Sequence, residues 1–258
     1  MVIRNIKYKK RQRGIDLLSL RFVASLTLLL MVFAGNPLSL AGELPPSESR
    51  DAAQESLRSF LEAIPDSDLH YFSLSKSDLP RTSVGRGFRL NTITPPVLEQ
   101  MEEGADVARA LTKAPVFLFP VVVDDQLKAL LTVEKRENRW ETISIGGAGV
   151  AREWETITRN WDTSVGFDHD FIRIYQAVAD LVLVTPPPGF SLEPNGQGED
   201  GSVIVLMDSA KMALSTQNQP LISQTKAYPP GVIMELLKAR VRKSIEHFEG
   251  SEDHQVLD

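Results

Sequence analysis

The sequence predicts an α+β protein in which an antiparallel sheet is covered by amphipathic helices. Three apolar segments within residues 115–146 are separated by the short polar turns DD and RENR, which is the pattern of an antiparallel meander. Segments on both sides of this stretch place apolar residues three or four positions apart, as helices with one buried face do. The 258 residues suffice for one large domain or two small ones.

The first predicted helix spans residues 49–65, and Pro65 ends it. Its apolar side chains recur at helical spacing and share one face: Leu57, Phe60, Leu61 and Ile64. We expect this helix to cover the sheet.

Residues 88–92 alternate between apolar and polar side chains, which predicts a short strand after a glycine-bearing turn. Thr94 followed by two prolines is then a typical helix start. We expect a single helix from there to Leu111, with a buried stripe made of Val97, Leu98, Met101, Ala105, Ala108 and Leu111.

Two residues of the meander predict irregular geometry. Pro120 cannot donate a ladder hydrogen bond, so the first strand is expected to lie at an edge or to be bulged there. Trp140 is offset from the alternation of the third strand, which also suggests a bulge. After Gly147 the period changes to that of a helix, with an apolar face made of Val150, Trp154, Ile157 and Trp161.

The second half of the chain gives weaker signals. Residues 170–184 fit either a strand or a helix, and we favour a strand because the segment ends in LVLVT. Residues 185–201 have the composition of a solvated loop, 202–208 predict a short strand and 209–215 a short helix. Residues 230–250 predict a long final helix that ends at Gly250.

The N-terminus has the organisation of a secretory signal peptide. Residues 1–21 carry seven positive charges, residues 22–35 carry none, and Ser39 and Ala41 are small residues suited to a cleavage site. Cleavage near Ala41 predicts a periplasmic or extracellular protein, and the alternative is an uncleaved N-terminal membrane anchor.

The predicted organisation of the chain follows from this N-terminal assignment. A signal peptide at 1–41 and a flexible linker at 42–49 precede a single α+β domain at 50–250, with a possible subdivision near residue 162. Residues 251–258 form a polar tail that we expect to be disordered.

Composition narrows the function classes. The absence of cysteine excludes a thiol nucleophile, a disulfide scaffold and thiolate metal sites. Removal of residues 1–41 takes away seven of the 28 basic side chains and one of the 34 acidic ones, which leaves a net charge of −12. Such a chain is repelled by nucleic acid and by anionic lipid, so we expect no nucleic-acid partner and no membrane insertion apart from the N-terminal signal or anchor.

Catalytic motifs are incomplete. Ser73 and Lys76 match the Ser-x-x-Lys pattern of penicillin-binding enzymes, but the companion Ser-Asp-Asn and Lys-Thr-Gly motifs are absent. The GGAG turn at 146–149 lacks the third glycine of a dinucleotide fingerprint, because Arg152 occupies that position. The DHD triplet at 168–170 is not joined by a second cluster with metal-ligand spacing. We therefore predict no catalytic residue, cofactor or metal.

Two basic clusters are candidate binding surfaces. The first is the glycine-bearing loop around Phe88, whose ring we expect to be exposed. Its cations are Arg81, Arg86 and Arg89, and we predict that this loop contacts a ligand or partner. The alternative for this loop is an ordinary strand with Phe88 inside. The second cluster lies on the last helix, where the charges stabilise the helix C-terminus or dock an acidic partner: Lys238, Arg240, Arg242 and Lys243.

The predicted function is that of an exported, non-catalytic protein that binds an unknown protein partner or small ligand in the cell envelope. The architecture of helices laid over an antiparallel sheet is similar to that of cystatin-like modules, by analogy only, and a fold does not imply a function. The alternative function is an envelope serine hydrolase that uses Ser73 and Lys76.

Overall fold

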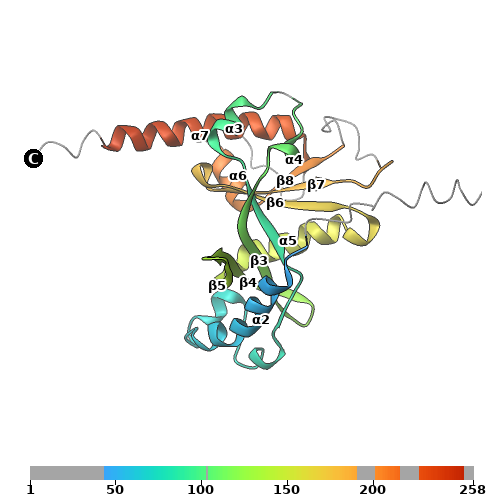
Figure 1. Cartoon of the computed structure of the whole chain (residues 1–258), viewed down its shortest axis with the longest axis vertical. Helices are drawn as coiled ribbons and strands as arrows, with labels where there is room; N and C mark the ends of the chain where they lie inside the picture. Colours follow the sequence, from blue (N-terminus) through green and yellow to red (C-terminus); the bar gives the residue numbers. More distant parts are fainter. Residues whose placement is uncertain (1–43, 103, 191–200, 216–226, 253–258) are drawn as a thin grey trace, which may run out of the picture. The chain divides into compact units, whose positions relative to one another are not determined.

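The computed structural model describes residues 44–102, 104–190, 201–215 and 227–252, all within one unit of the chain (Figure 1). Within these residues the strands form a nine-stranded sheet in the order β5-β4-β3-β2-β6-β7-β8-β9, with β1 beside β3. Neighbouring strands are antiparallel except β2 and β6, which run parallel. The predicted α+β class is confirmed.

The predicted meander and first helix are both present. The meander consists of β3 (Thr112–Val123), β4 (Gln126–Arg136) and β5 (Arg139–Gly146), and α2 (Ser47–Glu62) covers one of its faces. Because α2 begins at Ser47, the last residues of the expected linker are helical. Both meander turns use two residues with positive φ, which match the twist of the strands: Asp124, Asp125, Glu137 and Asn138.

Pro120 lies inside the sheet, because β3 has neighbours on both sides. The edge position considered for it is wrong and the bulge is right, since the β3–β4 register shifts at Val121/Val122. Pro120 faces the gap between β1 (Ser83–Val84) and β2 (Phe88–Thr92), where Gly85 donates its N–H to the Pro120 carbonyl at 2.7 Å. A proline is tolerated there because no strand needs its missing N–H.

The single helix expected from Thr94 to Leu111 is wrong. The chain instead forms two short helices, α3 (Pro95–Gln100) and α4 (Val107–Ala110). Gly104 has a φ of +86°, a left-handed conformation that interrupts a right-handed helix. The predicted stripe is right only in part: Leu98 and Met101 are buried, whereas Val97 and Ala108 are exposed. Val107, which the stripe did not include, is buried.

The opposite face of the sheet is covered by α5 (Ala148–Asn160), as the tryptophan-bearing pattern predicts. The Trp154 ring stacks on Phe88 of β2 with 3.9 Å between centroids, and its edge meets Phe171 of β6. These contacts fix α5 over the junction of β2 and β6.

The strand favoured over a helix for residues 170–184 is right in kind, but one continuous strand is wrong, because the segment is a hairpin. It contains β6 (Asp168–Ile174), a turn formed by η5 (Tyr175–Ala177) with Val178, and β7 (Ala179–Thr185). The sheet ends with β8 (Val203–Leu206) and β9 (Ala227–Tyr228).

Three helices cover this half of the sheet on the face opposite α5: α3, α6 (Asp208–Leu214) and α7 (Pro230–Glu252). The short helix and the long final helix are therefore confirmed, with α7 continuing two residues past Gly250. The remaining connections contain η2 (Leu69–Phe72), η3 (Leu79–Arg81) and η4 (Thr163–Val165). The predicted signal peptide, most of the 185–201 loop and the tail from residue 253 lie outside the described residues.

Candidate functional site

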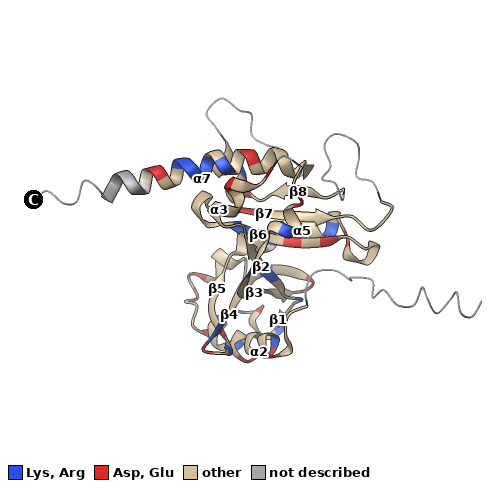
Figure 2. Cartoon of the chain, turned by 45° about the horizontal axis from the view of Figure 1, so that its top comes forward, with Lys and Arg blue, Asp and Glu red and all other residues tan. Residues whose placement is uncertain are grey.

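Figure 2 shows blue bands of basic residues along α7. The four basic residues of the α7 cluster divide into two pairs, one of which has a structural role. The ammonium group of Lys238 is buried and donates to the carbonyl of Met101 at the end of α3 and to Glu235. The guanidinium of Arg242 forms two hydrogen bonds with Glu99 of α3. Lys238 and Arg242 therefore hold α3 against α7.

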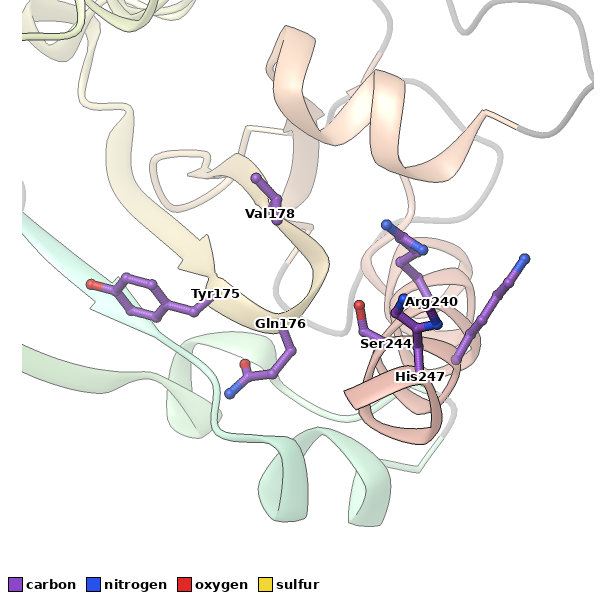
Figure 3. Close-up of a pocket in the computed structure, with 7 residues that line it drawn as sticks. Tyr175, Gln176, Val178, Arg240, Ser244 and His247 are labelled. Atoms are coloured by element: carbon purple, nitrogen blue, oxygen red, sulfur yellow. The ribbon is translucent and has the colours of Figure 1, made fainter. Parts of the chain in front are cut away.

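The other pair, Arg240 and Lys243, lies beside an open groove of about 360 Å³ between α7 and the η5 turn. We call it the α7–η5 groove. Its lining consists of Tyr175, Gln176, Val178, Arg240, Lys243, Ser244 and His247 (Figure 3).

The polar side chains of the groove come from one flank of α7. Figure 3 shows Arg240, Ser244 and His247 on the side of α7 that faces η5, while the ring of Tyr175 points away from the helix. At about 100° per residue, Lys243 lies farther from the core than these three, so it belongs to the outer rim. The groove side of α7 therefore carries two cations, Arg240 and Lys243, together with the hydroxyl of Ser244 and the imidazole of His247.

Arg240 contains an unusual polar atom. Its Nε is buried and has no hydrogen-bond partner among the described residues. A buried donor left unpaired costs about 1–3 kcal/mol, so native structures seldom retain one without a reason.

The backbone conformation and the exposure of Val178 both cost free energy in the chain without a ligand. Its backbone is left-handed (φ 53°, ψ 44°), a conformation that costs an L-residue about 1–2 kcal/mol and that a β-branched side chain tolerates poorly. Its side chain is also 73% exposed, so no packing offsets this cost. Strain that is retained without internal compensation is typical of functional positions.

The base of the turn is held rigidly. Arg173 of β6 and Asp180 of β7 form a two-point ion pair with N···O distances of 2.6 and 3.0 Å, and the hydrogen bond to Asp180 raises the pKa of Arg173. Ser209 of α6 accepts the backbone N–H of Asp180 at 2.9 Å. These bonds hold the two ends of the hairpin, so the strained Val178 cannot relax by shifting the ladder.

The loop predicted as a surface with an exposed aromatic ring is different in the structure. Phe88 is only 8% exposed because it packs beneath Trp154, so this part of the prediction is wrong. Arg89 points to the opposite face, where it lies over the Phe117 ring at 4.4 Å and donates to the Ala114 carbonyl. Strand alternation, the alternative considered for this segment, explains both positions.

The other two arginines of that loop lie elsewhere. Arg81 pairs with Asp78 and Asp124 near the first meander turn. Arg86 lies close enough to His169 to lower the pKa of the imidazole. The four predicted side chains therefore do not form one surface.

The residues of the hydrolase alternative are engaged with other partners. The exposed Ser73 hydroxyl accepts a hydrogen bond from Arg152 at 3.3 Å, and Lys76 pairs with Asp66. Neither side chain lines the α7–η5 groove. The described geometry gives this alternative no support.

The DHD triplet lies in β6 and directs its titratable groups to opposite faces. His169 is buried under α5, and burial lowers its pKa; its Nε2 has no hydrogen-bond partner among the described residues. Burial, aided by Asp168, raises the pKa of Asp170 to about 6, and Asn91 donates to its carboxylate at 3.1 Å. No group of three or more His, Asp or Glu in the described residues could hold a metal ion.

No family model, curated protein or solved structure matches the chain. Within the described residues, every helix is too short or too polar to cross a membrane. Sequence reasoning found the basic side of the groove but missed the η5 side. The signal that could have located it is the polar pair Tyr175–Gln176, which interrupts an otherwise apolar run.

Proposed function

We propose that this chain is a non-catalytic binding protein of the cell envelope that holds a protein partner or a small ligand in the α7–η5 groove. The observation that carries the proposal is Val178, a strained and exposed apolar residue at the rim of a groove. Neither property stabilises the fold, and contact with a ligand would account for both.

Charge supports an anionic ligand. The exported chain has a net charge of −12, whereas the α7 side of the groove carries the two cations Arg240 and Lys243. A local cationic site on an acidic protein selects ligands by sign, because like-charged partners are repelled from the rest of the surface.

Replacement of Val178 by asparagine tests the proposal. Asparagine tolerates the left-handed conformation, so Val178→Asn is expected to stabilise the protein by about 1 kcal/mol, a rise in melting temperature of about 2–4 °C. The same substitution should weaken ligand binding. A residue with a purely structural role would not combine higher stability with lost binding.

Binding can be followed by site-specific photo-crosslinking in the cells that produce the chain. A photoreactive residue at position 243 should give a discrete adduct that Val178→Asn removes. Val165→Asn, at another exposed valine outside the groove, is the matched control and should leave the adduct intact. The proposal fails if position 243 gives no adduct, or if the adduct persists in the Val178→Asn variant.

A further inference from the structure

We infer that the occupant of the α7–η5 groove is an acidic peptide segment that carries at least two carboxylates and an apolar side chain. This inference rests on the proposed function, because it names the class of ligand for the same groove. Four features of the groove favour a peptide over a small anion or a lipid surface.

The first feature is the spacing of the polar donors. Arg240 and His247 are seven residues apart, which corresponds to about 10 Å along the helix axis, and the ammonium group of Lys243 lies between them. A phosphate or a single carboxylate is bound by donors that converge on one point. Donors distributed along a line instead match carboxylates distributed along a chain.

The second feature is the position of the groove on α7. Residues 240–247 lie in the C-terminal half of a helix that runs from Pro230 to Glu252. Concentrated anions such as phosphate are favoured at helix N-termini, where backbone N–H groups point at the ligand, and are disfavoured towards the C-terminus. Single carboxylates that each meet one side-chain cation do not need the backbone donors.

The third feature is the geometry of Arg240. Its guanidinium lines the groove, and the terminal nitrogens of a guanidinium can bind a carboxylate through two parallel hydrogen bonds. A lysine at this position could not form the same two-point contact.

The fourth feature is the apolar rim. Val178 offers an exposed apolar side chain beside the cations, and a peptide with an apolar residue next to its carboxylates would cover it. An anionic bilayer fits less well, because the exported chain is strongly acidic and α7 also exposes Glu235 and Glu246.

A peptide array can test the inference on the purified chain. The array contains labelled 12-residue peptides in which three glutamates and one leucine are placed at every spacing from one to four residues. A matched set has glutamine in place of glutamate. We expect glutamate peptides to bind with a marked preference for some spacings, and their glutamine counterparts to bind at least about tenfold more weakly.

Variants connect the binding to the groove. Arg240→Gln should weaken binding of the best glutamate peptide about tenfold, and the exposed Lys243→Gln should weaken it by a smaller factor. Lys243→Gln keeps the test valid if Arg240→Gln fails to fold. Arg58→Gln, at an exposed arginine of α2 that does not line the groove, is the matched control and should change the affinity less than twofold.

Pyrophosphate and vesicles that contain phosphatidylglycerol are tested alongside the peptides. If either binds through Arg240 while no glutamate peptide does, the peptide inference is overturned and the groove remains a binding site. If no glutamate peptide binds and position 243 also gives no crosslink in cells, both the inference and the proposed function fail.

Discussion

Asp170 is predicted to destabilise the folded protein at neutral pH. Burial raises the pKa of this carboxyl from its ordinary value of 3.8 to about 6, and the nearby Asp168 adds to the effect. The native state therefore retains a proton between pH 4 and pH 6 that the unfolded chain has lost. Stability contributed by this proton is complete below pH 4 and is lost as the pH rises through 6.

The magnitude follows from the difference between the two pKa values. A tenfold difference in acidity corresponds to about 1.4 kcal/mol. The rise in the pKa of Asp170 therefore lowers the free energy of unfolding at neutral pH by at most about 3 kcal/mol. Because Asp170 remains partly exposed, solvent reduces this value, and we expect Asp170→Asn to raise the free energy of unfolding by about 1–2 kcal/mol at pH 7.5. The new side chain keeps an oxygen that can accept the hydrogen bond from Asn91.

Urea unfolding of the wild type and of Asp170→Asn at half-unit steps from pH 4 to pH 7.5 measures this effect. The two curves should meet near pH 4 and separate as the pH rises. Asp125→Asn, at an exposed aspartate in the first meander turn, controls for the loss of a charge and should show no difference confined to this window. Parallel curves for wild type and Asp170→Asn would refute the burial argument.

Three further predictions concern contacts that the helices make. Trp154→Ala removes the ring that stacks on Phe88 and should lower the free energy of unfolding by about 3–5 kcal/mol in urea titrations. Lys238→Met leaves the Met101 carbonyl without its donor and should cost about 1–3 kcal/mol, whereas Arg242→Met should cost less than about 1 kcal/mol by the same assay. Glu153→Ala removes the acceptor of the first N–H of α6 at 2.7 Å, so amide hydrogen exchange in α6 should accelerate, while Glu153→Gln should preserve its protection.

The elements that could be predicted from the sequence are those in which the spacing of apolar residues matches the side chains that are buried. The meander alternates because each strand has inward and outward side chains, and α5 repeats its apolar residues because one stripe lies on the sheet. The segment 95–111 was predicted as one helix because its apolar spacing is helical throughout, whereas its backbone is helical only in α3 and α4. Met101 and Val107 reach the core from opposite sides of an irregular linker around Gly104.

Only the α7 side of the α7–η5 groove could be predicted from the sequence. The cations of α7 are visible in the sequence, but their division between α3 and the groove depends on contacts with Glu99 and Met101, which are about 140 positions away. The η5 side left only the polar pair Tyr175–Gln176 as a signal, because a valine gives no local indication of a left-handed turn. Phe88 was misassigned because neighbouring arginines suggested exposure, whereas strand alternation decided burial.

The strand order links the structural half of α7 to the half that faces the groove. β2 and β6 are the parallel pair, so the chain leaves both strands at the same end of the sheet, into α3 after β2 and into η5 after β6. Lys238 and Arg242 then fix α7 to α3, which presents the opposite flank of the helix, with Arg240 and Lys243, to the strained turn. One helix thus uses two of its basic residues to set the position from which the other two can meet a ligand.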